Sequence, residues 1–270
     1  MSKGKQNFEM KTNSPRKTIL KAALSLICLS PLIISCSDDS EPETEPVALT
    51  SEEVAEIVGG SLAEDAQGLT LQIEEAATLA NSAEVQNDGS RVLQTIICDE
   101  SISESFDRSS QNGAVVGFDF TFSYNYQLTC TPLNLPQQFD FSFEQAGEVD
   151  GGRFSSVTTG EGSMLFTGME ITATEYTVAG SYDRQGTHTA KVRNRGIVEF
   201  SLELNLEELS LDKGSFEVLS GSGLFSIQGS SPSGAYELNG TLNYLGNQQV
   251  EITINDEVFI VDLANGEIIN

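Results

Sequence analysis

A strict alternation of apolar and polar residues from Val116 to Cys130 constrains the fold of this chain more than any other feature. Apolar or aromatic side chains take every second position. Because successive side chains of a strand point to opposite faces of its sheet, the pattern predicts a long β-strand with one aromatic face. Phe139, Phe141 and Phe143 alternate in the same way after a proline-containing turn. We therefore expect a long hairpin that curls or carries a bulge, since strands usually have three to ten residues.

An internal repeat extends the β prediction to the C-terminal part of the chain. Residues 176–182 match residues 236–242 at an offset of about 60 positions. We interpret residues 151–206 and 212–265 as the two copies, each with about four strands. The sequence thus predicts a mainly β domain at residues 90–270, an antiparallel meander curled into a barrel or sandwich.

Residues 49–85 differ from this domain because their apolar positions recur at helical spacing. Thr50 and Glu53 have the spacing of a capping box at a helix N-terminus. Gly68 interrupts the pattern, which leaves a broken helix and a helical hairpin over residues 50–84 as alternatives. The polar side of this segment is acidic, so we expect it to pack on the sheet and not on a membrane surface.

The first 35 residues have the three parts of a secretory signal: a basic stretch, an apolar stretch and a small residue at the end. The apolar stretch is too short for a membrane-spanning helix, which needs about 20 apolar residues. Ile33-Ile34-Ser35-Cys36 resembles the lipobox that lipoprotein signal peptidase recognises. We predict a signal peptide at residues 1–35, cleavage before Cys36 and a lipid on its thiol that anchors the chain to a membrane. An ordinary signal peptide followed by a chance cysteine is the alternative.

Residues 36–48 are acidic and lack apolar periodicity, so we expect a tether there. Cys36-Ser37-Asp38-Asp39 resembles the acidic export signal of surface lipoproteins in Bacteroidetes. The whole chain is similar to a group of flavobacterial surface lipoproteins, on the lipobox, this acidic signal, the Cys-flanked aromatic hairpin, Gly68-Leu69-Thr70 and Lys191-Val192-Arg193-Asn194. The resemblance implies a lipid-anchored protein of the outer membrane, exposed at the cell surface or otherwise on the periplasmic face. The resemblance implies no activity. For the acidic residues after Cys36, the alternative to an export signal is a solvated tether.

The charge of the predicted mature chain limits its partners. Cleavage would remove six of the 14 basic residues and one of the 40 acidic residues, which leaves 8 and 39 and a net charge of −31. Such a chain repels nucleic acids and anionic lipids. We therefore expect no nucleic acid among its partners.

Two cysteines, Cys98 and Cys130, remain in the mature chain once Cys36 carries a lipid. An exported protein experiences oxidising conditions, so we predict a Cys98–Cys130 disulfide, with two free thiols as the alternative. The bond would close a loop of about 33 residues and stabilise the fold by about 3–4 kcal/mol on the chain-entropy model.

Basic residues concentrate at one place in this acidic chain. We treat this cluster as a candidate anion-binding site for a phosphate, a sulfate or an acidic glycan, and it consists of Arg184, His188, Lys191, Arg193 and Arg195. On a strand, the last three would share one face. Cross-strand pairing with Glu199, Glu203 or another acidic strand is the alternative, with little effect on stability.

We find no catalytic constellation and expect no metal site or cofactor. His188 is the single histidine, it belongs to no G-x-S-x-G nucleophile elbow, and we expect it on a surface hairpin. The alternative is weak binding of Ca²⁺ at two acidic loops, Asp150-Gly151-Gly152 and Asn255-Asp256-Glu257.

Three functions follow from these features. The first is a membrane-anchored, non-catalytic protein that binds an unknown macromolecule or supports the envelope. The second is a carrier of a hydrophobic ligand, analogous in shape only to lipocalins and periplasmic lipid carriers, with a cavity lined by Phe118, Phe120, Phe139 and Phe141. The third is a hydrolase that uses carboxylates.

Overall fold

The computed structural model describes residues 49–85, 98–191 and 196–269. Cys36 with its lipobox, the tether, Arg193 and Arg195 lie outside these residues. In the described part, two helices precede ten strands: α1 (Ser51–Leu62), α2 (Leu69–Val85), β1 (Ser101–Ser109), β2 (Gly117–Cys130), β3 (Pro136–Asp150), β4 (Phe154–Thr167), β5 (Glu175–Ala190), β6 (Ile197–Asp212), β7 (Val218–Ser231), β8 (Gly234–Gly246), β9 (Gln249–Ile254) and β10 (Glu257–Asp262).

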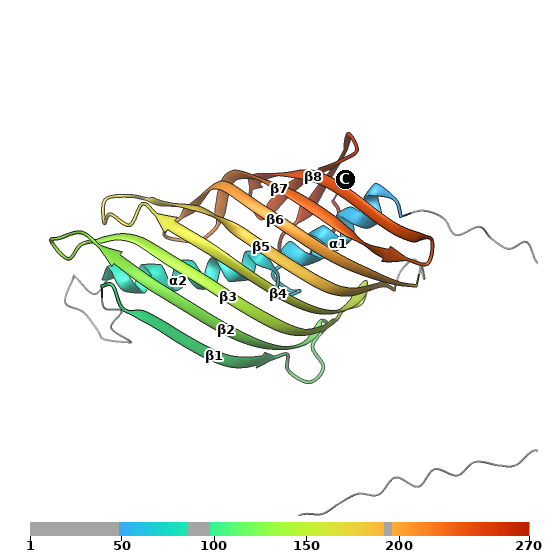
Figure 1. Ribbon diagram of the computed structural model, residues 1–270, viewed down its shortest axis with the longest axis horizontal. Coiled ribbons are helices and arrows are strands. Elements are labelled where there is room, and N and C mark those ends of the chain that lie inside the picture. Colours follow the sequence, from blue (N-terminus) through green and yellow to red (C-terminus); the bar gives the residue numbers. More distant parts are fainter. Residues whose placement is uncertain (1–48, 86–97, 192–195, 270) are drawn as a thin grey trace, which may run out of the picture. The chain divides into compact units, whose positions relative to one another are not determined.

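All ten strands form one antiparallel meander in which each strand pairs with the next strand of the chain. The sheet is curled but not closed, because β1 and β10 form its two edges among the described strands. Figure 1 shows α1 and α2 one after the other along the same side of the sheet. We call the sheet surface that faces the helices the inner face and the opposite surface the outer face. The predicted mainly β fold with a helical segment packed on it is confirmed.

The alternation of the sequence decides which side chains line the inner face. In β2, Phe120, Phe122, Tyr124 and Tyr126 are almost completely buried, whereas the side chains between them are exposed or partly exposed. β3 pairs with β2 so that Phe143 lies opposite Tyr124 on the same face. The predicted aromatic hairpin is confirmed, and its aromatic side is the core.

The long strands bend at local irregularities. The pairing of β5 with β6 shifts register between Val178 and Gly180, and the pairing of β8 with β9 shifts between Tyr244 and Gly246. Gly147 lets β2 and β3 approach closely, because a Cβ atom there would lie 2.2 Å from the carbonyl oxygen of Asp119. Bulges and close glycine contacts are the usual means by which a long strand curls.

The helical segment consists of two helices joined by a tight turn at residues 63–68, as predicted for a broken helix. Thr50 and Glu53 form the expected capping box at the start of α1. The turn requires glycine at position 68, since a Cβ atom there would lie 2.4 Å from the carbonyl oxygen of Ser61. α1 contacts β9 and β10, whereas α2 contacts β3 and β4. Within the described residues, no helix combines the length and the hydropathy that a membrane span requires.

The Cys98–Cys130 disulfide is present and joins the segment before β1 to the end of β2. The two repeat copies differ in strand content. Residues 212–265 hold four strands, β7 to β10, but residues 151–206 hold only β4, β5 and most of β6. The expectation of four strands in the first copy is wrong, because its strands have 14 to 16 residues each.

Candidate functional site

An aromatic cluster on the inner face lies under α2. Neighbouring rings are in direct contact, with centroids 5.4 Å apart for Phe106 and Phe122 and 4.9 Å apart for Tyr124 and Phe141. We define the cluster as Phe106, Phe120, Phe122, Tyr124, Phe141 and Phe143. From α2, the buried apolar side chains are Leu69, Ile73, Ala76, Ala77 and Ala80.

The four residues predicted to line a carrier cavity belong to this packed region or adjoin it. Phe120, Phe139 and Phe141 are at most 2 % exposed, and Phe118 packs against the core from a partly buried position. Phe139 contacts the rings of Tyr126 and Phe166. The aromatic face therefore serves as the contact surface of other side chains in this structure.

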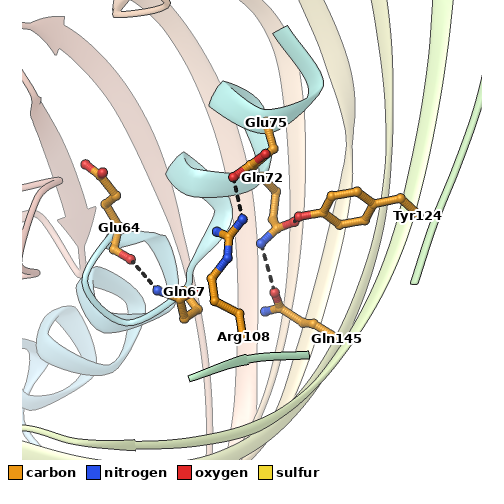
Figure 2. Close-up of polar contacts among 7 residues, drawn as sticks. All are labelled: Glu64, Gln67, Gln72, Glu75, Arg108, Tyr124 and Gln145. Atoms are coloured by element: carbon orange, nitrogen blue, oxygen red, sulfur yellow. Dashed lines mark hydrogen bonds and ion pairs between the residues drawn. The ribbon is translucent and has the colours of Figure 1, made fainter. Parts of the chain in front are cut away.

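A chain of buried hydrogen bonds joins α2 to β2, β3 and β5, and Figure 2 shows the part of it around Gln72. The Tyr124 hydroxyl donates to Gln72 Oε1 at 2.9 Å, and Gln72 Nε2 donates to Gln145 Oε1 at 3.2 Å. Gln145 Nε2 in turn donates to the Tyr182 hydroxyl at 3.0 Å. Burial raises the pKa of Tyr124 and of Tyr182, so both phenols stay neutral and able to donate. Gln72 is fully buried and links α2 to two strands by its side-chain amide.

An ion pair lies where α2 meets β1, also in Figure 2. Arg108 Nη2 lies 2.8 Å from Glu75 Oε1, and both side chains are about one-third exposed. The guanidinium also lies 5.6 Å from the ring centre of Phe106. Next to this pair, burial raises the pKa of Glu74 to about 7, and the charges of Glu64 and Glu75 add to the effect.

Arg184 of the predicted anion site lies in the interior. Its side chain is 2 % exposed and points to the inner face. The guanidinium donates to the carbonyl oxygens of Ser61 and Ala66, near the end of α1, and to Thr158 Oγ1. These contacts engage Arg184 inside the fold. The period-two pattern of β5 contained this information, because Arg184 shares a face with Tyr176 and Tyr182.

His188 is buried as well, so the expectation of a surface histidine is wrong. Its ring stacks on Phe154 with centroids 5.0 Å apart. Burial, followed by the charge of Arg184, lowers the pKa of His188 to about 4. The imidazole is therefore neutral at neutral pH and contributes no positive charge to an anion site.

Lys191 lies in the turn after β5 and not on a strand. Its ammonium group pairs with Asp150 and donates to the carbonyl oxygen of Gly151 at 2.7 Å, instead of pairing with Glu199 or Glu203. The structure thus places Arg184 and His188 inside and Lys191 on the surface. It does not gather these three on one exposed face.

The acidic loops show no metal site in the described part of the chain. Asp150 pairs with Lys191. Residues 255–256 form the tight turn between β9 and β10. Across the described residues, no group of three or more His, Cys, Asp or Glu side chains could hold a metal ion.

The outer face carries a feature that sequence reasoning missed, a row of four carboxylates. Strand pairing places Glu144 opposite Glu161, Glu161 opposite Asp183, and Asp183 opposite Glu203. All four side chains are exposed, and none pairs with a basic residue that the structure describes. We call them the carboxylate row. Neighbouring strands are about 4.8 Å apart, so the like charges are close.

The carboxylate row lies in a groove across the outer face. A hollow of about 520 Å³ contains the row and is flanked by Thr121, Thr159 and Ser201. Two further hollows, of about 470 Å³ and 780 Å³, share lining residues with it on either side. Short side chains and glycine along the middle of β2 to β5 leave this surface hollow, with hydroxyl and carboxylate groups along it.

Comparison with protein-family models, with curated protein sequences and with solved structures gives no match for this chain.

Proposed function

We propose that this chain is a lipid-anchored, non-catalytic binding protein of the outer membrane, exposed at the cell surface. The lipobox resemblance at Cys36 supports the anchor, and the acidic residues after it support the location. The groove on the outer face is the observation that carries the binding function. It is an open surface of the sheet that the helices leave uncovered.

Charge defines the class of partner. The carboxylate row repels nucleic acids and acidic glycans, and it attracts a basic polypeptide. Hydroxyl groups beside the row can donate and accept hydrogen bonds with a partner's main chain or side chains. Like charges directly opposite each other on a sheet are destabilising, and departures from local rules of stability concentrate at functional sites.

The anchor is tested by metabolic labelling with a radioactive fatty acid followed by membrane fractionation. We expect the wild-type chain to take up label and to sediment with the outer membrane. Cys36→Ser should lose the label and the membrane association. Cys28→Ser changes a second cysteine, within the apolar stretch of the predicted signal peptide, and should retain both. Label in the C36S chain would contradict the anchor.

The groove is tested by the binding of a fluorescent decalysine peptide to the full chain in a neutral detergent. The variant E144Q/E161Q/D183N/E203Q should weaken binding at least about tenfold at low salt, because it removes four charges from one surface. E100Q/E170Q/E208Q/E257Q is the matched control, since it removes four exposed carboxylates elsewhere. An equal loss in both variants would show that only net charge matters, and no loss in either would exclude the groove.

A further inference from the structure

We propose that the open edge of β1 is a self-association surface, on which β1 of a second copy of this chain pairs in antiparallel orientation. A two-fold axis at Phe106 would relate the two copies, so that one sheet continues into the other. The partner at this edge is therefore a second copy of the chain. The inference rests on other residues than the carboxylate row and does not depend on the proposed binding groove.

The two edges of the sheet differ in how they are covered within the described residues. β10 has six residues, and the end of the chain lies along its open side. There the Ile269 nitrogen donates to the Ile260 oxygen at 2.8 Å, and a β-bridge joins Ile268 to Val261. β1, at the other margin of the sheet in Figure 1, has nine residues and pairs only with β2 among the described strands. It contains neither proline nor lysine, which edge strands use against pairing.

The backbone groups of β1 point alternately toward β2 and toward the open side. The Ser110 nitrogen, directly after β1, donates to the Phe118 oxygen at 2.9 Å, and the register of β1 with β2 has no bulge. Because hydrogen-bonded pairs alternate with other pairs in an antiparallel ladder, the even-numbered residues of β1 bond to β2. The odd-numbered residues, from Ser101 to Ser109, direct their N–H and C=O groups to the open side. These groups are available for another antiparallel strand.

Charged and aromatic side chains on the inner face of β1 favour one register with a second copy. In a pairing centred on Phe106, Glu104 of each copy lies opposite Arg108 of the other, and the two Phe106 rings face each other. These positions form the pairs without backbone hydrogen bonds, in which side chains approach most closely. Opposite charges and aromatic rings directly across two strands stabilise their pairing. The two-fold axis repeats the ion pair, so both copies contribute one cation and one anion.

Neighbouring registers lack this complementarity. Centring the pairing on Glu104 or on Asp107 would place two carboxylates directly opposite each other, which is destabilising. Centring it on Ser105 would leave Glu104 and Arg108 opposite apolar side chains. Inward-pointing charges on an edge strand ordinarily prevent pairing, and here they oppose every one of these registers except the one centred on Phe106.

Both charged side chains can bind the second copy and keep their present contacts. Arg108 Nη2 lies 2.8 Å from Glu75 Oε1, and a guanidinium has further N–H groups to donate. Glu104 Oε1 accepts from the Tyr126 hydroxyl at 2.8 Å, and its carboxylate has a second oxygen. The pairing would also remove the partly buried Phe106 ring further from water.

Sedimentation equilibrium of the full chain in a density-matched neutral detergent tests the inference. The salt is set at about 0.15 M, which screens repulsion between two acidic copies beyond about 8 Å. We expect the wild type to have the mass of two chains. E104R and R108E should each weaken association at least about tenfold, because each places like charges opposite each other. An equimolar mixture of the two variants should restore association, since one then supplies both cations and the other both anions.

The mixture also separates the interface from an effect on folding, because a variant that fails to fold cannot recover when it is mixed. A single-chain mass for the wild type would overturn the inference. Undiminished association of E104R and R108E alone, or no recovery in their mixture, would overturn it as well.

A cross-link tests the register without a change of charge on the inner face. In the proposed pairing, Ser105 lies opposite Asp107 of the second copy, on the outer face. Mild oxidation should join S105C to D107C when the two chains are mixed, whereas either variant alone should cross-link much less. E257C, in the exposed β9–β10 turn, is the matched control and should give no cross-linked dimer. Equal cross-linking in the mixture and in the separate variants would contradict this register.

Discussion

Arg184 shows how a single buried charge is accommodated in this fold. The carbonyl groups at the end of a helix lack partners within the helix and carry partial negative charge. α1 has no basic residue in its last turn. Arg184, from β5 in the middle of the sheet, donates to the Ser61 and Ala66 carbonyls and takes that role. A residue that the sequence predicts in an anion-binding cluster is thereby an internal contact between helix and sheet.

The raised pKa of Glu74 makes the stability of the fold depend on pH. Its pKa rises from 4.5 to about 7 in the folded chain, chiefly through burial. The folded state therefore holds this proton more tightly than the unfolded state does. The resulting stabilisation is full below pH 4.5 and is lost as the pH rises to about 7. Glu74→Gln should reduce the fall in melting temperature between pH 5 and pH 8.

The pH dependence of the melting temperature in E74Q needs a control variant, because the chain has many other carboxylates. Glu257→Gln changes an exposed residue in the β9–β10 hairpin and should leave the fall in melting temperature as in the wild type. A wild-type pH profile in E74Q would mean that Glu74 does not titrate with a raised pKa.

At the scale of elements, α1 and α2 differ in how their ends are fixed. The Thr50 side chain accepts from the Glu53 nitrogen, and a Glu53 carboxylate oxygen accepts from the Thr50 nitrogen. Such a capping box satisfies two backbone donors at the helix start. α2 instead follows directly on Gly68 and Gln67 in the tight turn.

The capping box of α1 leads to a prediction for the free energy of unfolding. Thr50→Ala removes the acceptor for the Glu53 nitrogen and should lower the free energy of unfolding by about 1 kcal/mol, measured by chemical denaturation. Ser82→Ala, which removes an exposed hydroxyl from α2, should change stability by less than about 0.5 kcal/mol. A T50A chain as stable as the wild type would show that α1 is held by packing alone.

At the scale of the whole molecule, one curled sheet presents two surfaces of opposite character. The inner face is aromatic and covered by the helices, and the outer face is polar, hollowed and acidic. Each strand contributes to both faces because its side chains alternate. A binding groove and a packed core can therefore occupy the same strands without competing for residues.

The sequence by itself determined the mainly β fold, the aromatic hairpin, the break between the helices and the Cys98–Cys130 pairing. These features depend on local rules: the period of the side-chain pattern, the capping box, and the pair of cysteines that remains when Cys36 is assigned to a predicted lipid anchor. The period of two along β5 also indicates that Arg184 and His188 point to the inner face. The concentration of basic residues predicts a surface cluster only when the alternation of side chains along β5 is left out of account.

The tertiary structure decided the open curl of the sheet and the carboxylate row. Glu144, Glu161, Asp183 and Glu203 have no regular spacing in the sequence. They become neighbours only because the lengths of the turns between β3 and β6 set the register of each pair. Register depends on the turn geometry together with the packing of the inner face across several strands, and the pattern within a single strand does not specify it. The polar chain from Tyr124 through Gln72 and Gln145 to Tyr182 likewise exists only once α2 lies on the sheet.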